Sequence, residues 1–355
     1  MNTIDALTAW LDERTRDRAA FTGYQVSVVG AEDRFDIAGG LDALDRPVTV
    51  GSLVPGRCTV TKPLVALALC RLHVDGQLDL HTDTVSGFGL DAAPHVGRLT
   101  LAQLLGHSGG LHLTPAAAYS LVRPEARLAL ALHMPCPDGW DPATNRAYDE
   151  AAAWLILGRI LELATDAPYD DAVAVALADL GVDDGRILLR PGSDATDESW
   201  LADVAVDGAP RRDRSMRPMM VAGIRQHACE WCPSWSGFAS AGALAELGHA
   251  LARHRGTADS LGAAIRLMAS RYRVDPATGH AHGLGVNVDL GRWLTSDALG
   301  TDAFGHVARA AMFASTATHG IAVGLVGTPE NVALREETWR RTIELALDPS
   351  GSDLN

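Results

Sequence analysis

The chain has 355 residues, of which 47% are apolar and 21% charged, a balance typical of a globular protein with one large domain or two intertwined ones. The net charge of −14 is not offset by a basic stripe, which excludes nucleic acid and anionic membranes as expected partners. The first twenty residues predict an amphipathic helix rather than an export signal, and the cysteines at 58, 70, 136, 229 and 232 are odd in number. These features favour reduced thiols and a cytoplasmic protein.

Two kinds of element are predicted in the first part of the chain. Residues 3–20 are expected to form a helix, and the alternating residues 24–29 and 34–37 a pair of strands across the turn at 30–33. A further short strand is expected at 47–53. The strand pair therefore places the beginning of a sheet near the N-terminus.

The stretch 55–79 is the one around which the chain is expected to be organised. It opens with a turn at Pro55 and Gly56, and Gly76 is expected to end the helix that follows. Apolar residues recur there at three- and four-residue spacing, which predicts a helix: Leu64, Leu67, Ala68 and Leu72.

Thr59 and Lys62 stand three residues apart at the start of this helix, so both side chains are expected on one face. A hydroxyl beside an amine at a helix N-terminus can form a nucleophile, because the amine takes the proton and the helix dipole stabilises the alkoxide. Lys62 is the only lysine in the chain, and every other residue counted with it is an arginine. Because a lysine can act as a base and an arginine cannot, we favour a chemical role over a chance surface lysine.

Helical patterns fill the middle of the chain, and strand patterns return near its end. Tyr148 stands after the loop at 135–142, which proline and glycine break, and directly before a long predicted helix at 149–164. The other predicted helices are 99–105, 115–132, 172–180, 238–252, 258–270 and 330–347. Residues 182–218 form a polar surface excursion, and strands are expected at 283–288, 304–305, 310–315 and 320–326.

This order of elements predicts an α+β fold. An antiparallel sheet with flanking helices would be assembled from both ends of the chain, residues 1–58 and 275–355. Residues 59–274 would form a mostly helical inserted domain, with the active-site cleft between the two.

Six motifs follow one another between residues 28 and 326. They are Cys58-Thr59-Val60-Thr61-Lys62; Gly76-Gln77-Leu78-Asp79-Leu80; Leu104-Leu105-Gly106-His107-Ser108-Gly109-Gly110-Leu111; Tyr148-Asp149-Glu150 with the helix through Gly158; Gly237-Phe238-Ala239-Ser240-Ala241; and Gly283-Leu284-Gly285 with Phe304-Gly305-His306. With these motifs in this order, the chain resembles the serine β-lactamase and penicillin-binding-protein superfamily, closest to its class C and esterase-like branch. The resemblance implies a β-lactamase/transpeptidase-like fold.

The resemblance also implies acyl transfer on a small ester or amide, by an esterase, amidase or transacylase. Thr59 would attack a carbonyl to form an acyl-enzyme, and Lys62 and Tyr148 would move the proton. His306 would bind or polarise the substrate, and the backbone amides of Thr59 and near Arg309 would form the oxyanion hole. Water or another acceptor would release the acyl group. No cofactor or metal is implied, and the oligomeric state is not indicated.

Three positions depart from the pattern of that branch. Thr59 replaces serine, and its extra methyl group stiffens χ1 and crowds the attack. Glu150, expected beside the substrate, replaces asparagine or serine, and a carboxylate near Lys62 would hold the lysine charged. Ala308 replaces a glycine and adds a methyl group where substrate backbone lies close.

These departures leave two further hypotheses open. In the first, the same pocket performs non-covalent acid–base chemistry with Lys62, Tyr148 and His306, as an isomerase, lyase or cyclase in small-molecule biosynthesis. In the second, the protein is a catalytically silent binder. The retained single lysine argues against the second hypothesis, because a silent pocket has little need for a cation that can lose its proton.

Two other residues could serve as the nucleophile. Gly106-His107-Ser108-Gly109-Gly110 fits the Gly-x-Ser-x-Gly elbow of α/β-hydrolases, which needs a strand before it and a helix after it. A helix is predicted before this motif and a loop after it, so we interpret it as a turn and keep Ser108 as the fallback nucleophile. Cys58 is four residues from Lys62 rather than three, and we interpret it as small buried filler.

His227, Cys229 and Cys232 are three possible zinc ligands within six residues. No second pair follows at finger spacing, although His249 and His254 are present, so a loop with buried thiols is favoured over a metal site.

Two histidines and two tryptophans could also lie at a pocket. His280 and His282 are expected at the surface or at the rim of a pocket. Trp231 and Trp235 either line the cleft or form local core, and the sequence does not separate these two interpretations.

Overall fold

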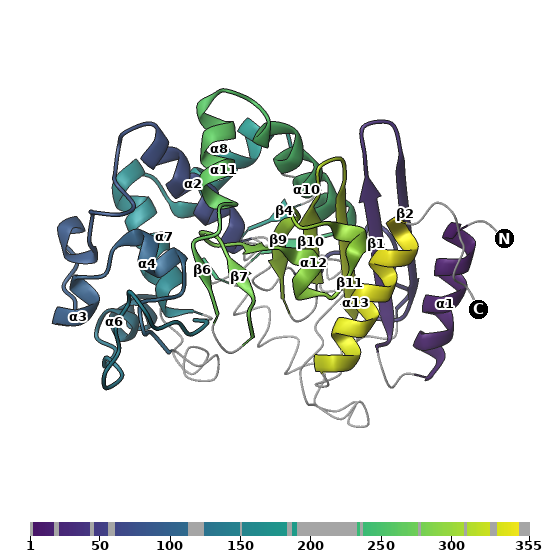
Figure 1. Cartoon of the computed structure of the whole chain (residues 1–355), viewed down its shortest axis with the longest axis horizontal. Helices are drawn as coiled ribbons and strands as arrows, with labels where there is room; N and C mark the ends of the chain where they lie inside the picture. The colour runs from purple at the N-terminus through teal and green to yellow at the C-terminus, as the bar shows by residue number, and fades with distance from the viewer. Residues whose placement is uncertain are drawn as a thin grey trace.

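The computed structural model describes residues 3–17, 21–42, 46–55, 61–112, 124–149, 151–182, 187–189, 233–234, 237–275, 278–308, 311–326 and 332–347. The predicted α+β fold is confirmed: an antiparallel sheet is packed by helices on both faces, and further helices lie beyond one end of it (Figure 1). The strands are β1 (Gly23–Val29), β2 (Arg34–Gly40), β3 (Val54–Pro55), β4 (Ile187–Leu188), β5 (Phe238–Ala239), β6 (Arg273–Val274), β7 (Ala281–His282), β8 (Asn287–Val288), β9 (Phe304–Val307), β10 (Ala311–Ser315) and β11 (Gly320–Val326). The α-helices are α1 (Thr3–Asp17), α2 (Thr61–Val74), α3 (Pro94–Gly97), α4 (Leu101–Leu105), α6 (Pro124–Leu132), α7 (Ala152–Thr165), α8 (Tyr169–Leu180), α10 (Ala241–Arg255), α11 (Ser260–Met268), α12 (Leu290–Trp293) and α13 (Val332–Leu347), and two short 3-10 helices are η1 (Val85–Phe88) and η4 (Asp297–Leu299).

The two ends of the chain meet in the eight-stranded sheet, whose order is β2-β1-β11-β10-β9-β8-β7-β6. Strand β1 pairs with β11 along its whole length, from Gly23 opposite Val326 to Val29 opposite Gly320. The sheet is therefore assembled from both termini, as predicted. A second sheet of three short strands has the order β3-β5-β4.

Both faces of the central strands are buried, as the alternation of side chains along β10 shows. Met312 and Ala314 point into a core shared with α1 and α13, whereas Ala311 and Phe313 point into a core shared with α10 and the helices beyond it. Figure 1 shows α1 and α13 side by side at one end of the molecule, with α3, α4, α6 and α7 at the other.

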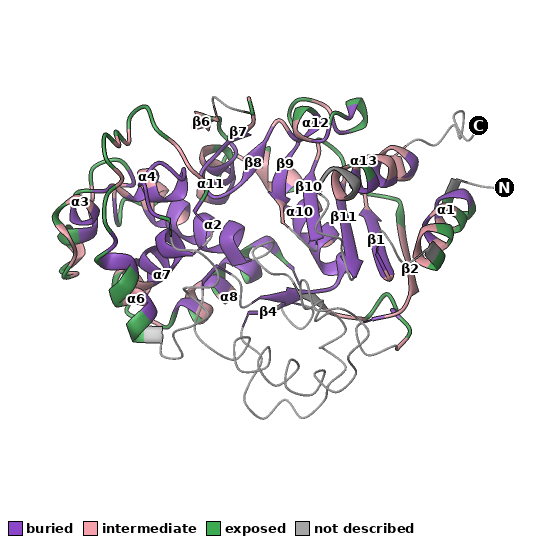
Figure 2. Ribbon diagram, turned by 90° about the horizontal axis from the view of Figure 1, so that it is seen from below, coloured by how far each residue is buried: buried purple, intermediate pink, exposed green. Residues whose placement is uncertain are grey.

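Helix α2 is the centre of the helical region and packs against α7, α8 and α11. Every residue from Thr61 to Cys70 is buried, and so is Leu72 (Figure 2). The predicted helix is therefore present, and alanine, leucine and valine fill all of its sides because other helices surround it. Gly76 does end the segment, with φ +73°, a left-handed value that glycine adopts without strain.

Several predicted boundaries differ from the structure. Residues 47–53 form no named strand, because 49–52 is a turn in which Ser52 N donates to Thr49 O at 3.0 Å. The stretch 283–288 is not one strand: residues 283–286 form a tight turn between β7 and β8, closed by the Gly283 N–H to Val286 O bond at 3.0 Å. The described part of the excursion at 182–218 includes β4. The division into two domains at residues 58 and 275 stays a prediction.

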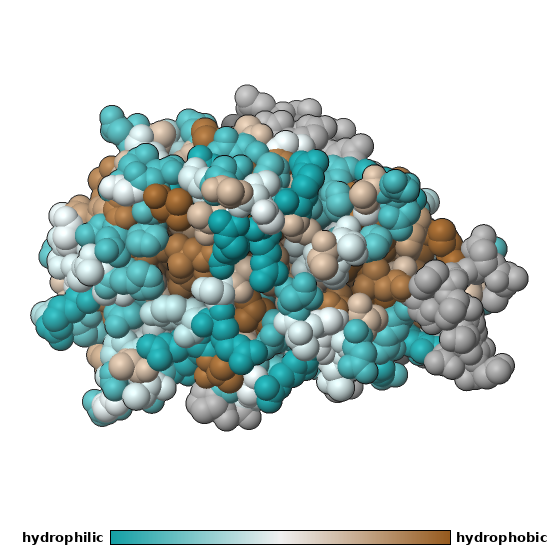
Figure 3. All heavy atoms as spheres, turned by 45° about the horizontal axis from the view of Figure 1, so that its top comes forward, coloured by the Kyte–Doolittle hydropathy of each residue, from teal (hydrophilic) through white to brown (hydrophobic). Residues whose placement is uncertain are grey.

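The surface shows no strong pattern of its own on the face drawn in Figure 3, where hydrophilic residues cover much of the molecule and hydrophobic groups lie between them. The exposed large apolar side chains of the described residues come from separate elements: Ile4, Val50, Leu130, Tyr148, Leu163, Val175 and Val274. Within the part of the chain that the structure describes, each helix is too short or too polar to cross a membrane.

Candidate active site

Lys62 lies in the first turn of α2 and is completely buried. Pro63 follows it, and proline is tolerated in a first helical turn because the N–H that it lacks has no partner there. The Lys62 Nζ atom lies 5.8 Å from the ring centroid of Trp154, which is buried in α7. A buried ammonium ion is costly unless polar groups meet it, so the groups around Nζ define the chemistry of the site.

Tyr148 provides one of these groups. Lys62 Nζ donates a hydrogen bond of 3.1 Å to Tyr148 Oη, although the two residues are 86 positions apart. Tyr148 is 45% exposed, so its phenol lies between the buried lysine and the solvent. An amine that is hydrogen-bonded to a partly exposed phenol can pass a proton between the interior and a bound substrate.

His107 packs beneath Tyr148, with the two ring centroids 4.6 Å apart. Its Nδ1 atom accepts a hydrogen bond of 3.1 Å from the Asp149 backbone N–H. Burial lowers the pKa of His107 well below its usual value, helped by interactions with His282, Arg146 and Lys62, so the ring is neutral. Because Nδ1 accepts, the proton of the neutral ring is on Nε2. His107 has φ +56°, a left-handed value that is uncommon for a residue with a side chain.

Asp149 follows Tyr148 and is also buried, with 3% exposure. Its carboxylate accepts hydrogen bonds from the backbone N–H groups of Ala152 (3.3 Å) and Ala153 (2.5 Å), which closes the first turn of α7. Burial raises the pKa of Asp149 to about 6, although the bonds to the helix and the charge of Lys62 oppose the shift. The predicted helix start at 149 is thus corrected to Ala152, and the Asp149 carboxylate accepts from the first N–H groups of the helix from a position before it.

His306 enters the site from β9 and is 3% exposed. Burial, and then the charge of Lys62, lower its pKa well below the usual value, so this imidazole is neutral as well. Its Nδ1 atom is buried without a hydrogen-bond partner among the described residues. The adjacent backbone is fixed, because Val307 N donates to Asn287 Oδ1 at 2.8 Å.

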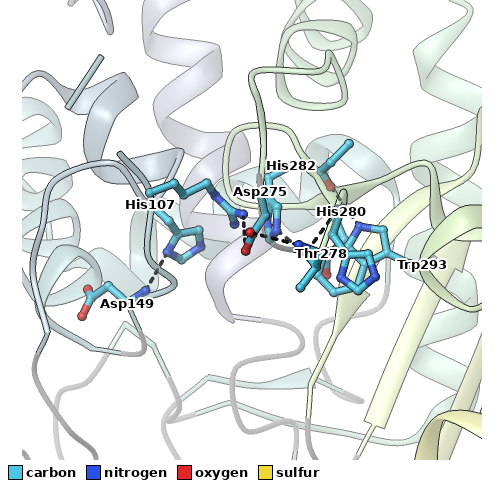
Figure 4. Close-up of polar contacts among 10 residues, drawn as sticks. His107, Asp149, Asp275, Thr278, His280, His282 and Trp293 are labelled. Carbon is cyan, nitrogen blue, oxygen red and sulfur yellow. Dashed lines mark hydrogen bonds and ion pairs between the residues drawn. The ribbon is translucent and has the colours of Figure 1, made fainter. Parts of the chain in front are cut away.

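A second cluster of polar side chains extends from His107 towards β7. Figure 4 shows Asp275 between His107 on one side and His280 and Trp293 on the other. His280 stacks on Trp293 with centroids 4.0 Å apart. Arg146 Nη1 lies 3.6 Å from Asp275 Oδ2, and the side chain of Arg146 is only 3% exposed.

His282 and Arg146 add to the electrostatic balance of this group. Burial and then the charge of Arg146 lower the pKa of His282 to about 2, and burial lowers the pKa of Arg146 to about 10. The His282 ring lies 5.9 Å from that of His107. The expectation that His282 is a surface or rim residue was wrong, since it is 4% exposed, whereas His280 is half-buried.

The tight turn between β7 and β8 presses the sheet against the helices that carry Lys62 and Trp154. Gly285 has φ +74° and donates its N–H to Leu105 O at 3.1 Å. A Cβ atom at this position would lie 2.4 Å from Ala66 Cβ in α2 and 3.0 Å from Trp154. Glycine is therefore required here both by conformation and by space.

Of the six residues singled out in the sequence, the structure brings Lys62 and Tyr148 into direct contact. The charge of Lys62 also contributes to the lowered pKa of His306. Thr59, Glu150 and Arg309 lie outside the described residues, as do Cys58, the segment 227–232 and Trp235.

Sequence reasoning gave no role to His107, Arg146 or Asp149. His107 and Asp149 both stand in motifs of the sequence, the first at 104–111 and the second directly after Tyr148. Their mutual contacts cannot be seen in a sequence.

The alternative sites can be judged on the described residues. Ser108 is fully buried and donates its hydroxyl to Gln103 O at 3.2 Å, after helix α4 and not after a strand. This is the geometry of a structural turn rather than of an elbow. Among the described residues, no three His, Cys, Asp or Glu side chains are placed to hold one metal ion.

Comparison with known proteins places this arrangement in context. The model of the family described as Beta-lactamase matches residues 11–347. A penicillin-binding-protein homologue from Caulobacter crescentus is 18% identical with a TM-score of 0.70, and the match covers 98% of this chain and 97% of that one. EstCE1, described as a hydrolase with promiscuous acyltransferase activity, is 17% identical with a TM-score of 0.71, covering 98% of both chains. A class C β-lactamase from Rhodobacter sphaeroides is 17% identical with a TM-score of 0.65, covering 97% of this chain and 100% of that one. No curated protein matches the sequence.

Proposed function

From the premise that this chain belongs to the β-lactamase family, we propose that it transfers or hydrolyses an acyl group on a small ester or amide. Thr59 is the nucleophile, which attacks the carbonyl and carries the acyl group. Lys62 and Tyr148 move the proton from the attacking hydroxyl to the leaving group. Water, an amine or an alcohol then takes the acyl group from Thr59.

The observation that carries this proposal is the hydrogen bond of 3.1 Å between Lys62 Nζ and Tyr148 Oη. It joins the only lysine of the chain to a phenol that is 45% exposed, at the N-terminal end of α2. Thr59 precedes Lys62 by three residues, which is the spacing at which a nucleophile reaches a base one helical turn away.

The remaining parts of the proposed site bind the substrate. His306 is a neutral imidazole on β9 and can polarise a carbonyl or hold it by a hydrogen bond. The backbone N–H groups of Thr59 and of the residues near Arg309 serve as the oxyanion hole, and Glu150 lies beside the substrate. The cleft lies between the sheet domain (1–58 with 275–355) and the helical domain (59–274).

A second candidate function has an observation of its own. His107 and His306 are both buried neutral imidazoles whose charged forms are disfavoured by Lys62. Together with Tyr148 they could serve an isomerase, lyase or cyclase that moves protons on a bound substrate without an acyl-enzyme. The methyl group of Thr59, which crowds attack, is consistent with this second reaction.

The test of the first candidate is turnover of a panel of p-nitrophenyl esters and amino-acid p-nitroanilides by the parent and by Tyr148→Phe. The substitution removes Oη and keeps the ring against His107, so folding should be preserved. We expect kcat/KM on the best ester to fall by roughly 10²- to 10⁴-fold, the usual contribution of a proton-transfer group. Unchanged turnover in Tyr148→Phe would remove Tyr148 from the mechanism. No turnover and no burst with any ester would favour the non-covalent candidate.

A further inference from the structure

Asp149 is a buried carboxyl group beside the Lys62–Tyr148 pair, and the proposed reaction assigns it no role. Its side chain accepts hydrogen bonds from Ala152 N and Ala153 N at the start of α7, and its own backbone N–H donates to His107 Nδ1 at 3.1 Å. It is 3% exposed. Three hydrogen bonds therefore fix both the side chain and the backbone of the residue that directly follows Tyr148.

The fixed backbone determines where the phenol of Tyr148 lies. The Tyr148 ring packs on His107, and its Oη accepts the hydrogen bond from Lys62. His107 thus contacts both residues of the dipeptide, Tyr148 through its ring and Asp149 through Nδ1 (Figure 4, in which His107 and Asp149 are labelled). A displacement of Asp149 from α7 would move the phenol relative to the ammonium group.

Lys62 and Asp149 also interact through their charges. The positive charge of Lys62 favours the ionised form of the Asp149 carboxyl and lowers its pKa, against the larger effect of burial. Such an interaction is reciprocal, so the ionised carboxylate favours the ammonium form of Lys62 to the same extent.

The other charged and titratable groups around the pair come from four places in the fold. His107 follows α4, His282 is on β7, His306 is on β9, and Arg146 precedes Tyr148 in the same loop. Burial is the main cause that lowers the pKa of each histidine, so all three rings are neutral near pH 7.

Arg146 differs from the histidines, since it forms an ion pair with Asp275. Asp149 is a carboxylate of this group whose charge interacts with that of Lys62.

We propose that Asp149 is a positioning residue for the Lys62–Tyr148 pair: its carboxylate keeps Lys62 an ammonium ion, and its hydrogen bonds hold the Tyr148 phenol where that ammonium donates to it. Lys62 then acts by its charge, and the proton of the attacking hydroxyl passes to Tyr148, which has to be a phenolate to accept it. The inference rests on the proposed function for its meaning in catalysis. The coupling between Asp149 and Lys62 can be measured without any substrate.

The measurement uses the fact that Lys62 is the only lysine in 355 residues. Protein labelled with [13Cε]lysine, without lysine in any tag, gives one side-chain signal that needs no assignment. In the parent, we expect this signal to keep its ammonium position through mildly alkaline pH and to show a small step near pH 6, where Asp149 ionises. In Asp149→Asn the step should vanish, and the change from ammonium to amine should begin about one pH unit lower, a tenfold change in the equilibrium.

Control variants separate charge from structure. Asp149→Asn removes the charge and keeps an oxygen that can accept from Ala152 N or Ala153 N at the start of α7. Asp91→Asn is the matched control, because that side chain is fully exposed, and the step should remain. A step that is lost in Glu150→Gln and kept in Asp149→Asn would overturn the proposal and assign the role to Glu150. So would a parent titration with no step, or one identical in the parent and in Asp149→Asn.

Turnover separates this inference from the proposed function. With p-nitrophenyl acetate, the acid limb of kcat/KM against pH should move in Asp149→Asn, with a smaller change in KM than in kcat. Turnover in the parent with an unmoved acid limb and no lysine step would refute the role of Asp149 and leave acyl transfer in place. A lysine step without turnover of any ester would support the coupling and refute acyl transfer.

Discussion

The unfolding free energy of Asp149→Asn, minus that of the parent at the same pH, should rise from acid to neutral pH. Burial raises the pKa of this carboxyl from 3.8 to about 6 in the folded protein. The folded state therefore holds the proton more tightly than the unfolded state does. The stability that this contributes is fully present below about pH 4 and is lost as the pH rises through 6.

The size of the effect follows from the shift of the pKa. A shift of one unit corresponds to about 1.4 kcal/mol, so the full loss is about 3 kcal/mol. Because the shift is not fully expressed at pH 4, we expect the difference in unfolding free energy, variant minus parent, to grow by about 2.5 kcal/mol between about pH 4 and pH 7.5. That is a large share of the 5–15 kcal/mol typical of a folded domain.

The assay is urea unfolding, followed by tryptophan fluorescence and circular dichroism, at several pH values across this range. Asp149→Asn keeps an oxygen that can accept from Ala152 N and Ala153 N, so the cap itself should survive. Asp91→Asn, in which the replaced side chain is fully exposed, should show no such growth. A difference between Asp149→Asn and the parent that stays constant with pH would refute the reasoning from burial.

Three further substitutions test the framework of the site. Gly285→Ala should lower the unfolding free energy by about 3 kcal/mol or more, because its Cβ would lie 2.4 Å from Ala66 Cβ at φ +74°. Gly76→Ala has φ +73° and open space around its Cβ, so it should lose only about 1 kcal/mol to backbone strain. Urea unfolding of the two variants compares these losses. Thr100→Ala should lose about 1 kcal/mol with the capping box of α4, and Thr100→Ser should restore it in the same measurement. Ser108→Ala should lower stability by about 1 kcal/mol and leave ester turnover within about twofold, and a loss of turnover like that of an active-site variant would revive the fallback nucleophile.

The sheet could be predicted where its strands are long or bounded by glycine. Strands β10 and β11 are buried on both faces, and their apolar runs are readable without knowledge of the partner strands. Strands β7 and β8 have two residues each, which is shorter than any periodic pattern. The predicted strand at 283–288 therefore joined the turn at 283–286 to β8 and missed β7. Helix α2 was found but its environment was not, since the neighbours that bury its other faces come from distant segments.

The site was predictable where composition or order gave a signal. Lys62 was found because it is the only lysine, and Tyr148 because it stands between a broken loop and a helix. The contact between Asp149 N and His107 Nδ1 joins residues 42 positions apart, and neither residue type announces it. The neutral state of the histidines likewise depends on burial, which a sequence does not state.

The central claim is covalent acyl transfer through Thr59, and mass spectrometry after reaction with a fluorophosphonate tests it most directly. The protein contains competing hydroxyl and thiol groups in Ser108 and Cys58, so the adduct must be located by peptide mapping as well as counted on the intact chain. The account predicts one adduct per chain on the peptide that contains Thr59, retained in Ser108→Ala and absent in Thr59→Ala. An adduct on Ser108 or Cys58, or folded protein that forms none, would contradict it.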